Sequence, residues 1–362
     1  MDLNKYIISI NREKRNTAGV KAPDDIVSIC KELGCREYIM PCFPKEKNKL
    51  YQKAWLIISG SHNWKKLMDA AEAGSIVIYQ HPMYGNRLAE KMIPVIQKRK
   101  NVKFIVLIHD LESLRGGIKG VINTSAKTND IADNVLLKKF DVVICHNEHM
   151  RQYLIDEGFD PEKLISLEIF DYLTAVERVQ KGKSDVPSIA IAGNLAIGKC
   201  AYIYNIFNEG NNSGLSANLY GINFREDQAC KNMLYHGSYK PEELPLHMEG
   251  DFGLVWDGNS AETCAGNTGE YLKYNNPHKT SLYLASGMPV IVWSQAAIAD
   301  FVLERGVGIT VDSLYEIEEK IRGITEEEYS QMCERVNHIG KQIREGSYTK
   351  AAIKKGIEKC LA

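Results

Sequence analysis

Short apolar runs alternate with longer amphipathic stretches from one end of this chain to the other, and this alternation constrains its fold more than any other feature. Such alternation is typical of parallel sheets covered by helices, and it argues against an all-helical or an all-β fold. In the first half, the stretches predict helices that include Asp24–Leu33, Gly85–Lys100 and Glu148–Glu157. The apolar runs of that half predict strands at Tyr6–Asn11, Tyr38–Phe43, Trp55–Gly60, Ile76–Gln80, Phe104–Asp110, Val142–His146 and Ile165–Leu167.

A second series of the same kind follows a polar segment that carries glycine and proline. We therefore expect an α/β protein with two doubly wound, Rossmann-like domains that face a cleft, residues 1–171 and 188–346, joined by a linker at 172–187. Residues 347–362 are long enough to form a helix that returns to the first domain. The second series predicts strands at Ile189–Ala192, Ala217–Gly221, Phe252–Trp256, Pro289–Trp293 and Gly308–Val311, a short helix at Leu314–Ile321 and a helical tail from Glu326 to Ala362.

Composition narrows the possible functions. The chain has 362 residues, enough for two domains, and its formal net charge of −1 gives no general attraction to nucleic acid or to an anionic membrane. Peripheral attachment through a local basic patch stays open. No apolar run is long enough to span a bilayer, and residues 1–11 lack the layout of a signal peptide. The nine cysteines are irregularly spaced with no C-x-x-C pair, so we expect reduced thiols in a cytoplasmic protein.

The segment from Tyr274 to Trp293 predicts a site for an anion. Asn276 is expected to cap a helix, with Pro277 in the first turn, where a missing N–H costs nothing. Lys279 then lies within one turn of unpaired backbone donors, an arrangement that binds phosphate, and Asn275 and His278 belong to the same site. Gly287 ends the helix before a buried strand. The alternative is an ordinary capped helix with no ligand.

A second candidate for phosphate contact follows the strand at 189–192. Gly193-Asn194-Leu-Ala-Ile-Gly198-Lys199 has the spacing of a P-loop, but Cys200 stands where Ser or Thr would bind Mg²⁺. A P-loop NTPase therefore stays open as an alternative. As a plain strand-to-helix turn, the loop would bring Asn194 and Lys199 to the same phosphate as Lys279.

Polar residues at the end of the Phe104–Asp110 strand predict acid–base chemistry. The sequence places His109, Asp110, Glu112 and Arg115 together at the carboxyl end of an apolar strand, where α/β sheets keep their sites. A carboxylate or imidazole there could remove a proton from an attacking hydroxyl. The alternative is an aspartate that only caps the next helix.

Three further segments carry candidate residues. The run Cys145-His146-Asn147-Glu148-His149 lacks further ligands at useful spacing, so we expect no metal site there and expect Asn147 to cap the helix that carries Met150. Tyr239 could stack on a base. The turn after the first strand would meet a substrate, unless it is only a flexible loop before a capped helix. The remaining candidates for substrate binding are Asn16, Thr17, Gly19 and Lys21 in that turn, and Tyr220 and Asp257 in the second series.

Together these segments resemble a bacterial family of GT-B glycosyltransferases. The family includes β-1,6-galactofuranosyltransferases of surface polysaccharides and the second-step glucosyltransferases of serine-rich-repeat adhesins. The resemblance spans nearly the whole chain. It rests on Asn16…Gly19-Val-Lys21-Ala-Pro-Asp-Asp25, Ile108-His109-Asp110-Leu-Glu112-Ser-Leu-Arg115, His146-Asn147-Glu-His-Met150, Ile169-Phe170-Asp171-Tyr172, Gly253-Leu-Val-Trp-Asp257-Gly258, Asn275-Asn-Pro277-His278-Lys279 and Gly287-x-Pro289-Val.

The resemblance implies a UDP-sugar donor held by the C-terminal domain, an acceptor hydroxyl held by the N-terminal domain, no metal or other cofactor, and self-association. Asp110, with His109 as second choice, would be the general base. Retaining GT-B enzymes usually carry a Glu in the helix before the Gly-x-Pro-Val-Ile strand, whereas Leu282 or Tyr283 stands there in this chain. Ribose recognition must then come from elsewhere.

Likeness to the galactofuranosyl and second-step glucosyl enzymes favours inverting transfer of a hexose, glucose or galactose in its pyranose or furanose form, to a surface glycan or glycoprotein. Two alternatives of the same fold are a catalytically silent partner of another glycosyltransferase and a sugar-nucleotide epimerase.

Overall fold

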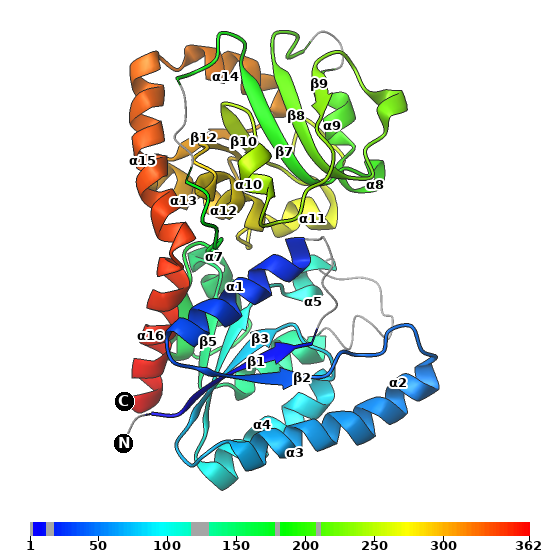
Figure 1. Ribbon diagram of the computed structural model, residues 1–362, viewed down its shortest axis with the longest axis vertical. Helices are drawn as coiled ribbons and strands as arrows, with labels where there is room; N and C mark the ends of the chain where they lie inside the picture. The colour runs from blue at the N-terminus through cyan, green and yellow to red at the C-terminus, as the bar shows by residue number, and fades with distance from the viewer. Residues whose placement is uncertain (1–2, 12–17, 117–129, 178–181, 208–210) are drawn as a thin grey trace. The chain divides into compact units, whose positions relative to one another are not determined.

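The computed structural model describes residues 3–11, 18–116, 130–177, 182–207 and 211–362. By its internal contacts the chain divides into two compact units. Unit 1 comprises Met1–Arg15, Pro23–Leu167 and Thr349–Ala362, and unit 2 comprises Asn16–Ala22 and Glu168–Tyr348. Both units are α/β (Figure 1).

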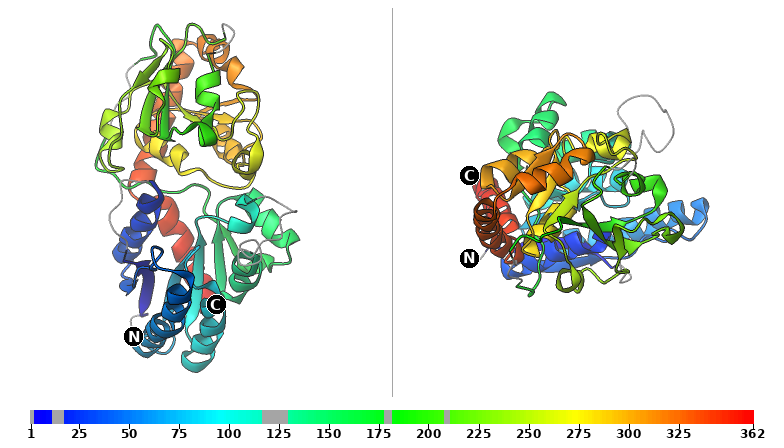
Figure 2. Two further views of the ribbon diagram at one scale, coloured as in Figure 1. Left: turned by 90° about the vertical axis from the view of Figure 1, so that its right-hand side faces the viewer. Right: turned by 90° about the horizontal axis from the view of Figure 1, so that it is seen from above.

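Unit 1 is built on a six-stranded parallel sheet in the order β2-β1-β3-β4-β5-β6, with helices on both faces (Figure 2, left). Every residue of β3 is buried, as expected for a central strand covered on both sides. The strands are β1 (Lys5–Ile10), β2 (Arg36–Met40), β3 (Ile76–His81), β4 (Lys103–Ile108), β5 (Val142–Cys145) and β6 (Leu164–Ser166). The helices are α1 (Ala18–Glu32), α2 (Lys49–Trp55), α3 (Ser61–Ala70), α4 (Asn86–Lys100), α5 (Glu112–Arg115), α7 (Glu148–Asp156) and α16 (Ser347–Leu361), with π-helical segments η1 (Leu56–Gly60) and η2 (Ile131–Leu136). Residues 18–22 of α1 and 347–348 of α16 are assigned to unit 2.

Unit 2 repeats the plan, with a six-stranded parallel sheet in the order β12-β11-β10-β7-β8-β9. These two sheets confirm the predicted pair of Rossmann-like folds. The strands are β7 (Ser188–Asn194), β8 (Ser216–Ile222), β9 (Met233–Tyr235), β10 (Phe252–Val255), β11 (Val290–Trp293) and β12 (Gly308–Val311). The helices are α8 (Ile197–Cys200), α9 (Tyr202–Asn205), α10 (Leu244–His247), α11 (Gly266–Tyr271), α12 (His278–Ala285), α13 (Ile298–Arg305), α14 (Ile317–Gly323) and α15 (Glu326–Arg344).

The expected strand at Trp55–Gly60 is wrong, because this segment is helical. Asn48 caps α2 by accepting a hydrogen bond from the Tyr51 N–H at 2.9 Å, and α2, η1 and α3 follow without a break. Ile57 and Ile58, which the pattern placed inside a sheet, are 70% and 73% exposed. The short edge strand β9 lies where no strand was expected.

The expected helical tail is two helices. Gly346 has φ 75°, a conformation that glycine adopts without strain, and it separates α15 from α16. From Thr349 onward the chain belongs to unit 1. There a Cβ at Gly356 would lie 3.2 Å from Ile105 and 3.6 Å from Val142, so α16 packs closely on the sheet of unit 1.

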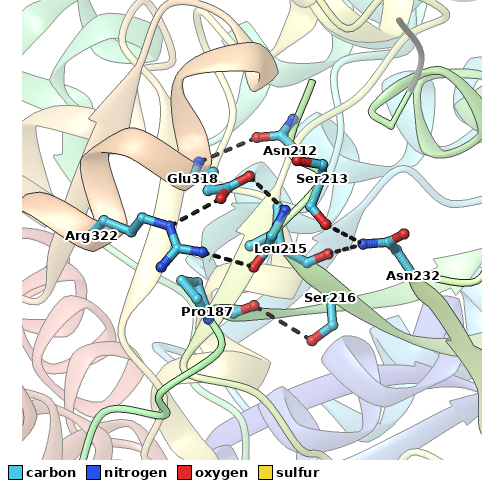
Figure 3. A network of polar contacts seen from close by, with 9 residues as sticks. Pro187, Asn212, Ser213, Leu215, Ser216, Asn232, Glu318 and Arg322 are labelled. Carbon is cyan, nitrogen blue, oxygen red and sulfur yellow. Dashed lines mark hydrogen bonds and ion pairs between the residues drawn. The ribbon is translucent and has the colours of Figure 1, made fainter. Parts of the chain in front are cut away.

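In unit 2, a polar network fixes the turn that leads into β8 (Figure 3). Glu318 of α14 accepts a hydrogen bond from the Gly214 N–H at 2.9 Å and from Arg322 at 3.0 Å. Asn212 accepts from the Glu318 N–H, and Asn232 donates to the carbonyls of Ser213 and Leu215. Backbone N–H and C=O groups in this turn are not paired by a neighbouring strand, and the polar side chains of Glu318, Arg322, Asn212 and Asn232 supply their hydrogen-bond partners.

Candidate functional site

The start of α12 in unit 2 differs from its expected form. Pro277 occupies the N-cap position with no side-chain cap, and Asn276 donates from its amide to the carbonyl of Glu168 at 3.0 Å. The cap predicted for Asn276 is therefore wrong, because its side chain is hydrogen-bonded to a carbonyl that is distant in the sequence. The first turn keeps backbone N–H groups that have no partner within the helix, which is what an anion site needs.

Lys279 is held in place beside this helix start. Its Nζ donates to the carbonyl of Trp256 at 3.1 Å and lies 3.7 Å from Oδ1 of Asp257, at the end of β10. Both side chains are largely buried, with exposed fractions of 23% for Lys279 and 20% for Asp257. Oδ1 of Asp257 accepts no hydrogen bond from the described residues. One N–H of the ammonium is thus used, and two remain for a ligand.

His278 and Lys21 lie near each other within unit 2. Lys21 is 6% exposed, donates to the carbonyl of Leu173 at 2.7 Å and lies 4.8 Å from the centre of the Tyr172 ring. The His278 ring is 5.4 Å from the same ring, and its buried Nε2 has no hydrogen-bond partner in the described chain. Burial, helped by the nearby charge of Lys21, lowers the pKa of His278 to about 4, so the imidazole is neutral at pH 7. The ring nitrogen that carries no proton, Nδ1 or Nε2, can then accept a hydrogen bond.

The loop after β7 brings two more candidates to unit 2. Asn194 is exposed and accepts from the Ala196 N–H at 3.1 Å, and Lys199 is exposed on the four-residue helix α8. Gly193 comes close to Lys279, since a Cβ at Gly193 would lie 3.9 Å from Lys279 Cε.

Cys200 argues against the P-loop alternative. Its thiol points into the chain and donates to the carbonyl of Asn194 at 3.0 Å. Burial raises its pKa to about 11, so the group at the position of the Mg²⁺ ligand is a neutral thiol that is already used.

Two tyrosines among the substrate-binding candidates, Tyr220 and Tyr239, are packed against histidines. Tyr220 is 1% exposed, stacks on His236 with ring centres 4.8 Å apart and accepts from the Glu249 N–H. Tyr239 stacks on His247 at 4.0 Å and is half-buried. Of the two, Tyr239 is the more exposed. Asn275, next to α12, has a buried Oδ1 that accepts no hydrogen bond from the described residues.

In unit 1, the polar residues after β4 are brought together as expected. Asp110 and Glu112 both pair with Arg115, with oxygen-to-nitrogen distances of 3.2 Å and 3.3 Å. Nε2 of His109 lies 2.8 Å from Oε1 of Gln80, at the end of the neighbouring strand β3. The Asp110 side chain is 33% exposed, so a substrate can reach it.

Sequence reasoning missed a buried pair beside this group. Nε2 of His81 lies 2.8 Å from Oδ1 of Asp133, and Oδ2 of Asp133 accepts from the Ser113 N–H at 2.7 Å. The side chains of His81 and Asp133 are buried, with exposed fractions of 0% and 2%. The position of His81, at the carboxyl end of a buried strand, could have flagged it. Asp133 had no such signal, because it comes from a distant segment of irregular helix.

The run at 145–149 has structural roles. Asn147 caps α7, as expected, by accepting from the Met150 N–H at 2.9 Å. Nε2 of His146 lies 3.1 Å from the carbonyl of Ile108, and burial lowers the pKa of His146 to about 3. Within the described residues, no three His, Cys, Asp or Glu side chains lie close enough to hold a metal ion.

Two expected substrate-binding residues, Asn16 and Thr17, lie outside the described residues. Gly19 is in the first turn of α1. No helix in the described part of the chain is long and apolar enough to cross a membrane.

Comparison with known proteins places this arrangement in a family. The N-terminal domain model of the glucosyltransferase 3-like family matches residues 4–169, and its C-terminal domain model matches residues 189–356. The β-1,6-galactofuranosyltransferase WbbI of Escherichia coli K12 is 36% identical over 257 residues, which cover 71% of this chain and 72% of WbbI. Glucosyltransferase 3 of Streptococcus gordonii is 27% identical over 344 residues and 92% of each chain.

Solved structures agree on the fold. The structure of Anabaena HepE in complex with UDP has a TM-score of 0.61 at 11% identity and covers 98% of this chain and 99% of its own. WaaG, a glycosyltransferase of lipopolysaccharide biosynthesis, has a TM-score of 0.58 at 12% identity and covers 96% of this chain and 98% of its own. The fold is therefore GT-B, and because the two domain models match most of the sequence, the chain belongs to the glucosyltransferase 3-like family of glycosyltransferases.

Proposed function

We propose that this glycosyltransferase transfers a hexose, glucose or galactose in its pyranose or furanose form, from a UDP-sugar to a hydroxyl of a surface glycan or glycoprotein. The names of the relatives support a hexosyl group, since one is a galactofuranosyltransferase and another a glucosyltransferase. The UDP complex of HepE supports a uridine nucleotide, because that chain has the same fold.

The start of α12 carries the proposal. Backbone N–H groups of its first turn and the ammonium of Lys279 bind the diphosphate of the donor. The Trp256 carbonyl holds that ammonium at 3.1 Å before any ligand arrives, so binding loses little side-chain freedom. Asn194 and Lys199 contact the same diphosphate from the loop after β7.

Neighbouring side chains recognise the rest of the donor. Oδ1 of Asp257 is buried and accepts no hydrogen bond from the described residues, so it accepts one from a hydroxyl of the donor. Asn275 and neutral His278 offer further acceptors. These groups replace the ribose-binding Glu that retaining GT-B enzymes usually carry in this region.

The transfer step is a single displacement with inversion. The acceptor oxygen forms a bond to C1 of the sugar as the bond from C1 to the UDP oxygen breaks. Asp110 takes the hydroxyl proton, with His109 as the second candidate, and the electron pair of the broken bond leaves with UDP. Lys279 and Lys199 stabilise the charge that develops on the diphosphate, so no metal ion takes part.

Calorimetric titration tests the donor site. The parent is expected to bind UDP without added metal and in the presence of EDTA, and to bind ADP at least tenfold more weakly. Lys279→Ala should weaken UDP binding by about 10- to 100-fold, the loss of a charged hydrogen bond worth about 1.5–3 kcal/mol. Lys341→Ala, an exposed lysine of α15, serves as control. Equal UDP binding by Lys279→Ala would remove the diphosphate assignment.

A second assay tests the reaction. With UDP-glucose, UDP-galactose and UDP-galactofuranose offered in parallel, we expect UDP release to depend on an added saccharide acceptor. Asp110→Asn should lower the transfer rate by at least 100-fold and leave UDP affinity unchanged. NMR of the product reports the anomeric configuration, and a retained configuration would contradict the single displacement.

A further inference from the structure

The helix that runs from Lys49 to Ala70 exposes an apolar stripe on its outer side. The stripe consists of Leu50, Tyr51, Ile57 and Ile58, with exposed fractions of 79%, 49%, 70% and 73%. Residues seven apart lie on the same side of a helix, which brings Leu50 to Ile57 and Tyr51 to Ile58, with Ala54 between them. Four large apolar side chains gathered on one helical face are unusual on a protein surface without a binding role.

The stripe is not the face by which this helix joins its unit. Trp55, which borders the stripe, packs edge-on against Phe43 and Tyr84, with ring centres 5.8 Å and 5.5 Å apart. Trp64 is 4% exposed, and Leu67 is fully buried. The helix therefore buries one apolar face inside unit 1 and exposes a second one. It lies at the margin of that unit (Figure 1).

The charge around the stripe is strongly positive. Residues 45–66 contain six lysines and one glutamate, in a chain whose net charge is −1. The six lysines are all exposed, and they are Lys45, Lys47, Lys49, Lys53, Lys65 and Lys66. Such an excess of positive charge attracts an anionic surface and repels another copy of itself.

We propose that the apolar stripe and its lysines bind the surface of a membrane that contains anionic lipids. The helix lies in the plane of the interface, with the four apolar side chains among the acyl chains near the headgroups. Lysines beside them extend their ammonium groups to the lipid phosphates. Apolar insertion and charge attraction are both present on one helix, and stable surface attachment needs two such contributions.

Vesicle co-sedimentation of the full chain tests this proposal. The parent is expected to bind vesicles of phosphatidylglycerol and phosphatidylethanolamine at least tenfold more tightly than vesicles of phosphatidylcholine, with binding that weakens as salt is raised. A double variant, Ile57→Glu with Ile58→Glu, should lose at least tenfold in vesicle affinity. Because both side chains are exposed, it should keep the parent's circular dichroism. Lys49→Gln with Lys53→Gln should lose affinity for the anionic vesicles only.

Leu303→Glu provides the matched control, since Leu303 is 58% exposed on α13 in unit 2 and its variant should bind like the parent. The proposal is overturned if the parent binds neither kind of vesicle, or if the Ile57/Ile58 variant binds as the parent does. It is also overturned if sedimentation velocity shows a parent oligomer that this variant dissociates while vesicle binding is absent, since the occupant would then be a second copy.

Discussion

At the scale of single residues, two buried histidines link stability to pH. Burial lowers the pKa of His278 to about 4 and that of His146 to about 3, against an ordinary value of 6.5. As pH falls below 6.5, these two histidines become protonated in the unfolded chain but stay neutral in the folded chain. The free energy of unfolding therefore falls with pH, by about 2 kcal/mol per histidine between pH 7 and pH 5.

Urea unfolding at a series of pH values measures this effect. His278→Gln should reduce the slope of the unfolding free energy between pH 7 and pH 5, whatever it does to the value at pH 7. His62→Gln, at an exposed position, should keep the parent's slope. If the His278 variant and the parent had the same slope, His278 would not be the buried neutral group described here.

The pair of His81 and Asp133 gives a second prediction at this scale. Asp133 ties β3 to α5 through His81 and the Ser113 N–H, and it lies beside the residues proposed for acid–base chemistry. In Asp133→Asn the amide can donate only to Nε2 of His81, which moves the ring proton to Nδ1, a buried atom with no partner in the described residues. We expect a loss of about 2–4 kcal/mol in unfolding free energy. A fall in transfer rate should accompany it, with UDP affinity unchanged. Asp130→Asn, at an exposed position, should alter neither quantity.

Two asparagines show where local sequence stops being informative. Asn147 and Asn276 both precede a helix, and both were expected to cap it. Asn147 does, since its side chain accepts from the Met150 N–H of α7. Asn276 instead donates to the carbonyl of Glu168, 108 residues earlier, and no residue near Asn276 in the sequence indicates that partner. A helix cap can be predicted from sequence where every group that competes for the capping side chain lies within a few residues of it.

At the scale of elements, the contact between α15 and α12 depends on a glycine. A Cβ at Gly340 of α15 would lie 2.4 Å from the carbonyl of Leu284 in α12, closer than atoms can approach. Gly340→Ala must push the helices apart, and we expect a net loss of about 1–3 kcal/mol in unfolding free energy. Since α12 carries Lys279, UDP binding should weaken as well.

Gly323→Ala supplies the comparison, since a Cβ there meets nothing within 4 Å. It should leave both unfolding free energy and UDP affinity within a few tenths of a kcal/mol of the parent. Equal stability of the two variants would mean that α15 and α12 are not packed as tightly as described.

Elements were predictable where burial and sequence pattern agree. Phe104 to Ile108 is apolar, β-branched in part and fully buried in β4, so the strand was found from its sequence. Trp55 to Gly60 is also mostly apolar but lies in a helix whose outer side chains stay in solvent. The sequence pattern cannot distinguish the buried strand from the exposed helix. An apolar run indicates that its side chains avoid water, but it does not indicate which partner covers them. The membrane proposed above is such a partner.

At the scale of the whole molecule, unit 1 is assembled from both ends of the chain. Its sheet is formed by residues before 168, whereas the part of α16 that belongs to it, from Thr349 onward, follows the last residue of unit 2. Ile353 of α16 is fully buried, and Lys350 pairs with Glu32 at 2.7 Å, so this helix completes the core of unit 1. The sequence suggested such a helix only through the length of its tail, since the partner of a terminal helix is not encoded near it.

A chain that ends at Gly346 should therefore be destabilised in unit 1 and not in unit 2. Without α16, the side chains of Ile105 and Val142 that face Gly356 lose their cover, and several kcal/mol of apolar burial are lost. We expect a melting temperature lower by about 10 °C and early trypsin cleavage within residues 23–167. A chain that lacks only Leu361 and Ala362, both exposed, should melt as the parent does. If the shorter chain kept the parent's melting temperature and cleavage pattern, α16 would be an appendage and unit 1 would be complete by residue 167.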